Sequence, residues 1–132
     1  MNMFPDQRET RPHDQRVADQ LVRLNEHLAH ARATSSTMVK RLADAPSQLS
    51  CLNDLQSLPV LRKSELIELG AADPFGGLVG RPEDLAHVYR SPGPITDVDG
   101  HAGDWWRFGR ALHAAGIGVG VRIQNCFAYH FT

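Results

Sequence analysis

The sequence has little cysteine, few aromatic residues and no marked excess of charge of either sign. Its 132 residues include 2 cysteines, 7% aromatic residues, and 14 Lys and Arg against 15 Asp and Glu. Two cysteines are too few for a disulfide framework, so we expect a reducing cytoplasm. A net charge of −1 argues against a nucleic-acid partner held by a basic face. The sequence also lacks an apolar run near the roughly 18 residues of a membrane span, so we expect no membrane partner.

The composition is that of a folded protein, because 42% of the residues are hydrophobic and 22% are charged. The length suits one domain or part of a larger one. Residues 1–12 are polar, contain two prolines and show no periodicity, which predicts a disordered leader. The remainder, residues 13–132, is expected to form one folded segment.

An apolar stripe begins at Val17 and continues to Leu42 with alternating steps of four and three residues. This spacing is typical of an amphipathic helix. The Ser/Thr run at 34–37 favours capping over helix continuation, so we predict two helices, at about 13–33 and 36–44. The stripe could form a coiled-coil dimer or lie on its own domain. We favour the second interpretation, because the flanking charges are irregular and the repeat ends early.

The rest of the chain reads as short elements separated by Gly/Pro-rich loops. We predict helices at about 63–69 and 104–115 and strands at about 87–90 and 121–127. The order strand, loop, helix, strand suits a parallel crossover unit. The predicted fold is therefore α/β, with a helical N-terminal region followed by an incomplete, mainly parallel sheet. Further strands would be needed to cover it, so the sequence is expected to be cut short.

Few residues suggest chemistry by themselves. His27 and His30 share a helix face but lack further ligands at suitable spacing, so no metal site is expected. Cys126 is predicted to be an inert thiol in a buried strand, and Trp105 to belong to the core. The loop at 91–94 follows a strand, as phosphate-binding loops do, but two of its four residues are prolines without an N–H.

Several segments occur in an order that resembles phenylacetate–CoA ligase-like proteins of the adenylate-forming superfamily. Leu58-Pro59 and the following Lys63-Ser64-Glu65-Leu66 are similar to a signature near the start of that family. The later segments follow in the family's order: Pro74-Phe75-Gly76, Pro82 to Leu85, His87 to Ser91, Ala114-Ala115-Gly116 and Asn125 to Tyr129. Each motif alone is weak, and the order makes the resemblance specific.

The resemblance implies an ATP-dependent, AMP-forming ligation of an acid to coenzyme A, with a magnesium ion. It assigns Phe127 and Tyr129 to a pocket for an aryl or other apolar carboxylic acid. Ser91, Gly93 and Thr96 correspond to the family's phosphate loop, but the paired threonines and the following Gly-Lys are absent. The family's adenine-binding, magnesium-binding and ribose-binding segments and its lid lysine would lie beyond residue 132.

We therefore expect a truncated N-terminal segment of such a ligase, without catalytic residues, cofactor or activity of its own. Two alternatives remain open. One is a binding or regulatory module that docks on a full-length ligase, and the other is a non-functional remnant. An exposed sheet edge at 123–127 would favour docking or self-association.

Overall fold

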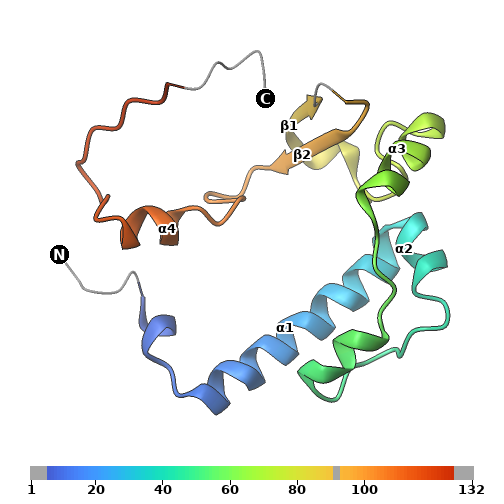
Figure 1. Ribbon diagram of the computed structural model, residues 1–132, viewed down its shortest axis with the longest axis horizontal. Helices are drawn as coiled ribbons and strands as arrows, with labels where there is room; N and C mark the ends of the chain where they lie inside the picture. The colour runs from blue at the N-terminus through green and yellow to red at the C-terminus, as the bar shows by residue number, and fades with distance from the viewer. Residues whose placement is uncertain (1–5, 91–92, 127–132) are drawn as a thin grey trace.

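The computed structural model describes residues 6–90 and 93–126. The structure contains both helices and strands, which agrees with the broad prediction of an α/β protein. The elements form an open ring: the long helix α1 (His13–Thr34) lies along one side and the two strands lie on the opposite side (Figure 1). In order, the elements are η1 (Gln7–Thr10), α1 (His13–Thr34), α2 (Ser36–Arg41), η2 (Leu52–Ser57), α3 (Lys63–Ala72), η3 (Pro82–Asp84), β1 (Leu85–Arg90), β2 (Thr96–Gly100) and α4 (Gly109–Ala114).

The break between α1 and α2 falls at the predicted Ser/Thr run. Ser35 leaves helical geometry, with φ −110° and ψ 116°, and its hydroxyl accepts a hydrogen bond from the Met38 N–H at 3.1 Å. This is N-capping by a serine side chain, which satisfies one of the free N–H groups of the new helix. α2 ends at Arg41, three residues before the predicted boundary, and continues as turns.

The buried core is built on the predicted apolar stripe. Leu28 of α1 packs with Leu42 and Leu49, which are both 2% exposed. Half-buried residues surround this cluster: Leu21, Leu24, Met38, Ala45 and Leu58. The stripe thus packs within its own chain, as in the interpretation favoured above.

Polar side chains fasten the segment after α2 to α1. Asn25 donates to the Leu49 carbonyl at 2.9 Å and accepts from the Leu49 N–H at 2.8 Å. Arg32 donates to three main-chain carbonyls, those of Leu42, Ala45 and Pro46. Because both side chains bind main-chain groups, they fix the path of this segment directly over the apolar stripe.

A bidentate ion pair connects α2 with α3. Arg41 donates to the two carboxylate oxygens of Glu65 at 2.8 and 2.9 Å. Glu65 also accepts from the Arg62 N–H at the start of α3. These hydrogen bonds hold the pKa of Glu65 below its ordinary value, the bond from Arg41 being the largest cause.

The sheet differs from the predicted one. β1 and β2 pair antiparallel, with His87 opposite Asp99 and Arg90 opposite Thr96. Only residues 91–95 separate the two strands, which is enough for a hairpin and far too short for a crossover helix. Residues 96–100, where the sequence predicted neither a helix nor a strand, therefore form a strand, and no parallel pairing occurs within the described residues.

The C-terminal elements are shorter than predicted. The helix expected at 104–115 is α4 (Gly109–Ala114), because Asp104 and Arg107 adopt positive φ and form turns. Asp104 accepts from the Gly109 N–H at 2.8 Å, so it caps a later helix start than expected. Residues 121–126 lie outside any strand, and Phe127 is outside the described residues. A strand needs a paired neighbour, and this segment has none among the described residues.

Two further predictions need correction. Trp105 is 47% exposed and does not belong to the core, because the turn at 104–107 carries it to the surface. The predicted disordered leader lies partly outside the described residues, and residues 7–10 form η1 instead. η1 forms because the Asp6 side chain accepts from the Arg8 N–H at 2.7 Å.

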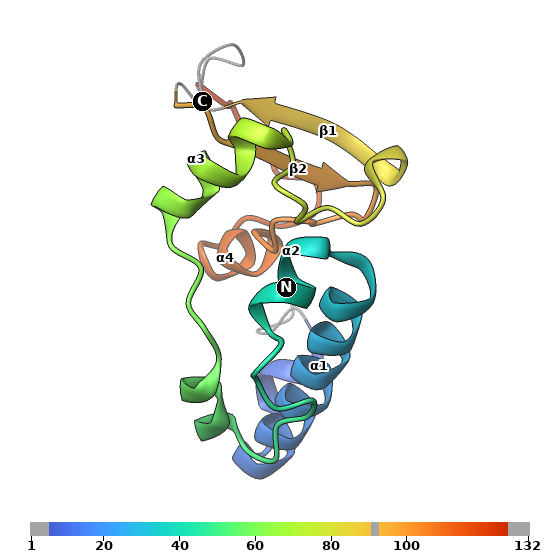
Figure 2. The same cartoon turned by 90° about the vertical axis from the view of Figure 1, so that its right-hand side faces the viewer.

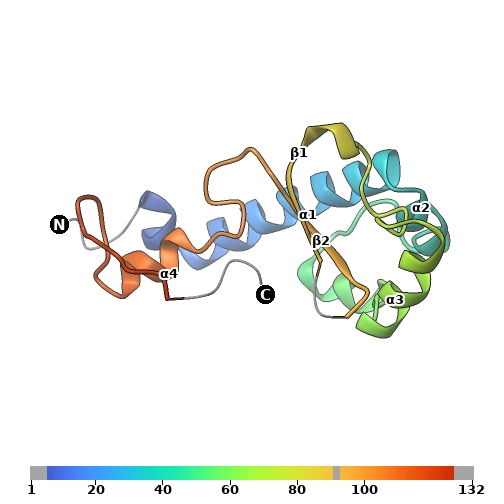
Figure 3. The ribbon, with the colours of Figure 1, turned by 90° about the horizontal axis from the view of Figure 1, so that it is seen from above.

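The molecule leaves much of its apolar surface uncovered. Seen from two further directions, α3 lies beside the hairpin, whereas α4 lies beside the N-terminal turn at the opposite end (Figures 2 and 3). The chain exposes 10499 Å², against about 6,900 Å² expected for a compact protein of 14.6 kDa. Exposed large side chains include Val60, Trp106, Phe108, Val119 and Ile123. Across the described helices, none is long and apolar enough to span a membrane.

Candidate functional site

Gly93 to Thr96, the described part of the segment that resembles a phosphate loop, lie between β1 and β2 and at the start of β2. Gly93 is exposed, Ile95 is buried, and Thr96 begins β2 opposite Arg90. Ser91 lies outside the described residues. A phosphate cradle needs converging N–H groups, which Pro94 cannot supply and which a strand-to-strand turn does not place at a helix N-terminus. The described residues of this turn therefore do not fit the ATP phosphates.

A polar cluster lies on one face of the hairpin beside this turn. His87 Nδ1 is 2.9 Å from one carboxylate oxygen of Asp99, and the Tyr89 hydroxyl donates to the other at 3.0 Å. The His87 side chain is 66% exposed, whereas that of Asp99 is only 13% exposed. The rings of His87 and Tyr89 have centroids 5.9 Å apart. The cluster thus fixes the His87 ring while most of that side chain stays exposed.

The pKa of the Asp99 carboxyl group is shifted by its neighbours in this cluster. Burial raises its pKa, but the hydrogen bonds from His87 and Tyr89 together with the charge of His87 outweigh burial, and the net pKa is lowered. The same contact with Asp99 raises the pKa of Tyr89. A carboxylate with a lowered folded-state pKa stabilises the fold above its unfolded pKa, and that contribution is lost as pH falls through the folded value.

We therefore expect the Asp99 carboxyl group to titrate below 3.8, its ordinary value, in an NMR pH titration of the native chain. The double variant His87→Ala/Tyr89→Phe should raise the pKa, because both hydrogen bonds to the carboxylate are removed. Val88→Ala is the matched control, since Val88 is exposed on the same strand. An Asp99 pKa that stays the same in the double variant would contradict this assignment.

An apolar cavity lies between α4 and the segment that ends at Cys126. It has a volume of about 660 Å³ and is lined by Phe108, Leu112, Ile123, Gln124, Asn125 and Cys126. The predicted pocket residues Phe127 and Tyr129 are outside the described residues. Cys126 is exposed and free, so the prediction of a buried strand thiol is wrong. Within the described residues, no strand lies beside its segment to cover it.

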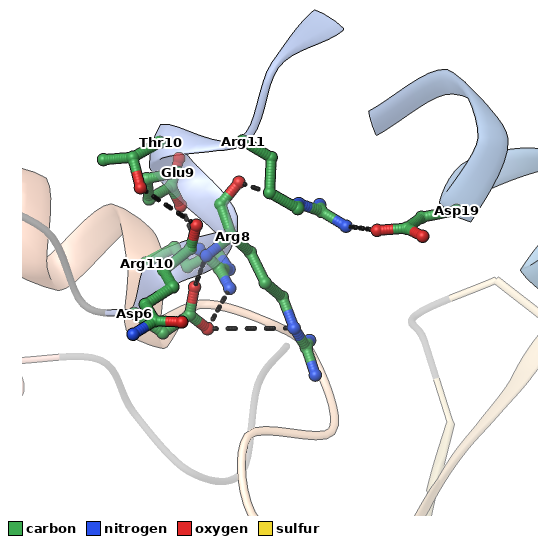
Figure 4. A network of polar contacts seen from close by, with 8 residues as sticks. Asp6, Arg8, Glu9, Thr10, Arg11, Asp19 and Arg110 are labelled. Carbon is green, nitrogen blue, oxygen red and sulfur yellow. Dashed lines mark hydrogen bonds and ion pairs between the residues drawn. The ribbon is translucent and has the colours of Figure 1, made fainter. Parts of the chain in front are cut away.

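A cluster of ion pairs joins the N-terminal turn to α4 (Figure 4). Arg110 donates to Asp6 at 2.6 Å and also binds Glu9, more than 100 residues away in sequence. Burial raises the pKa of Asp6, but the Arg8 N–H and Arg110 outweigh it and lower the net pKa. On the other side of η1, Arg11 binds Asp19 of α1. We call these ion pairs of Asp6, Glu9, Arg11, Asp19 and Arg110 the clasp. They connect η1 with α1 on one side and with α4 on the other.

The histidine pair suggested by sequence lies on the surface of α1. His27 and His30 are both exposed on α1. In the part of the chain that the structure describes, no three His, Cys, Asp or Glu residues lie close enough to hold a metal ion.

Sequence reasoning missed both the His87–Asp99–Tyr89 cluster and the clasp. Alternation along β1 places His87 and Tyr89 on one face, which was a usable signal. Asp99 could be joined to them only once β2 was recognised as a strand. A scan against models of known protein families found no match, and neither did a search of curated proteins.

Proposed function

We propose that this chain is the N-terminal part of an ATP-dependent, AMP-forming acid–CoA ligase similar to phenylacetate–CoA ligases. The observation that carries the proposal is the ordered run of family-like segments between Leu58 and Tyr129. In such a protein the hairpin belongs to a mainly parallel sheet that further chain completes. An aryl or other apolar carboxylic acid is the proposed substrate of the whole protein, and the cytoplasm its proposed location.

The uncovered surface of the molecule supports this proposal. Large exposed apolar side chains gather in the C-terminal segment, including Trp106, Phe108, Val119 and Ile123. Exposure of so much apolar area is unfavourable in water, and additional protein covering it would recover that free energy. The antiparallel pair β1–β2 also has open edges at which further strands could join.

The apolar cavity supports the proposed class of substrate. Phe108, Leu112 and Ile123 give it an apolar wall, and it ends at the residue before Phe127. A pocket with mostly apolar lining and few polar groups suits an aromatic acid whose carboxylate remains accessible for reaction. The family resemblance assigns Phe127 and Tyr129, outside the described residues, to a pocket for the same class of acid.

The chain is not proposed to catalyse the reaction by itself. ATP, magnesium and coenzyme A belong to the complete ligase, and adenylation needs groups that stabilise charge on the transferring phosphate. Gly93, Pro94 and Thr96 in the hairpin do not fit that task.

The test compares the 132-residue chain with a version extended in frame through the coding sequence that follows codon 132. Both are assayed for ATP–pyrophosphate exchange that depends on added phenylacetate or benzoate. Exchange by the extended protein alone is expected. A natural stop after codon 132, or acid-dependent exchange by the short chain, would overturn the proposal.

A further inference from the structure

A large cavity opens between the N-terminal turn, α1 and α4, and arginines dominate its walls. We call it the arginine cavity; its volume is about 930 Å³. It is lined by Arg8, Arg11, Arg16, Arg23, Arg107 and Arg110. None of these arginines belongs to the segments that carry the family resemblance. Ligand binding in this cavity therefore does not depend on the proposed ligase function.

Local geometry and the clasp together create this cavity. Arg16, Gln20, Arg23 and His27 are spaced by four, three and four residues, which places them on one face of α1. Arg107 and Arg110 come from the opposite wall. The two walls are joined because Arg110 binds Asp6 and Glu9 of the N-terminal turn (Figure 4). The arginines therefore face one space although they are far apart in sequence.

The positive charge of the cavity is only partly compensated. Three carboxylates line it, those of Asp6, Glu9 and Asp104, and a fourth, Asp19, binds Arg11 from outside. Six guanidinium groups against four carboxylates leave a formal charge of +2.

The uncompensated charge can be assigned to particular side chains. Among the described residues, Arg16, Arg23 and Arg107 have no carboxylate within ion-pair distance. The Arg16 guanidinium donates to the Arg11 carbonyl at 3.4 Å, which is a neutral acceptor and leaves its charge uncompensated. Asp104 lies near Arg107 in sequence, but one of its oxygens already caps α4 at Gly109. Guanidinium groups that share a cavity without counter-charges repel one another, and an anion would relieve that repulsion.

We propose that the arginine cavity binds a phosphate monoester. A monoester carries a charge between about −1.5 and −2 near neutral pH, which matches the formal +2 of the cavity. Its three acceptor oxygens accept the paired N–H donors of arginine and can bind more than one guanidinium group. A phosphate group alone fills a small part of 930 Å³, so the organic part of the ester occupies the remainder, beside Leu24 and the stems of the arginines.

The test is calorimetric titration of the full 132-residue chain at low ionic strength. The probes are inorganic phosphate and glucose 6-phosphate, with glucose as the uncharged control. We expect saturable one-to-one binding of both phosphates and none of glucose. The variant Arg23→Gln/Arg107→Gln should weaken binding about tenfold or more, because two charge-assisted donors are lost.

Arg81→Gln is the matched control, since it removes one positive charge from an exposed side chain that pairs with Asp84 outside the cavity. Far-UV circular dichroism checks that each variant is folded, and Arg16→Gln replaces the double variant if that one unfolds. The proposal is overturned if neither phosphate binds saturably, or if Arg81→Gln weakens binding as much as the cavity variant. Because no ATP or acid is present, the result is independent of the ligase assay.

Discussion

Replacement of Leu42 by alanine is expected to lower the free energy of unfolding by about 2–5 kcal/mol. Leu42 is 2% exposed and packs against Leu28 and Leu49 at the centre of the core cluster. Truncation removes its buried methyl groups and leaves a cavity that neighbouring side chains fill only partly. Since few described side chains are fully buried, this loss removes a large share of the available core.

Urea unfolding followed by far-UV circular dichroism measures the effect. Val39→Ala is the matched control, because Val39 is a residue of α2 only three positions away and is 49% exposed. Its midpoint should shift little, since exposed substitutions usually change stability by about 0.5 kcal/mol or less. Equal shifts for the two variants would show that Leu42 is not part of a cooperative core.

Replacement of Gly77 by alanine is the second change with a large expected effect, about 2–4 kcal/mol. Gly77 has φ +64°, where an L side chain is strained. A Cβ atom there would lie 2.5 Å from the Ser36 hydroxyl and 2.7 Å from the Thr37 hydroxyl. Its carbonyl also accepts from the Ser35 hydroxyl at 2.6 Å. The substitution would therefore push the 73–80 loop away from the start of α2.

Gly116→Ala separates the two contributions. Gly116 has φ +79° but open space around it, so alanine there should cost only the backbone strain of about 1 kcal/mol. The difference between the two variants in urea midpoint reports the close approach of the loop to α2. A Gly77→Ala variant no less stable than Gly116→Ala would contradict that contact.

The helices of the first half could be predicted because their signals are local. The step of three and four residues along α1 identifies the face that packs, and a Ser/Thr run identifies the break at Ser35. Both signals act over one or two helical turns, where backbone hydrogen bonds and side-chain capping operate. The same reasoning places the start of α3 correctly, although the helix continues to Ala72, past the predicted end at 69.

The sheet could not be predicted as well, because strand pairing depends on contacts between distant residues. The sequence around β1 indicates an extended segment, but its partner β2 contains Asp97 and Asp99, which are typical of loops. Asp99 is stable in the strand because His87 and Tyr89 on β1 bind its carboxylate. The segment 121–126 shows the converse, since it contains apolar residues suited to a strand but belongs to no sheet among the described residues.

Periodicity, composition and capping residues were thus enough to fix the amphipathic first helix, its break and the modest charge of the chain. The antiparallel hairpin, the exposed position of Trp105 and the arginine cavity were decided by tertiary contacts. The cavity is the clearest case, because Arg110 meets Asp6 across more than 100 residues of chain. Helical hydrogen bonds and caps join residues that are close in the sequence, so local patterns predict them. Strand pairing and ion pairs such as Arg110–Asp6 join residues that are far apart in the sequence, and no local pattern indicates which residues will meet.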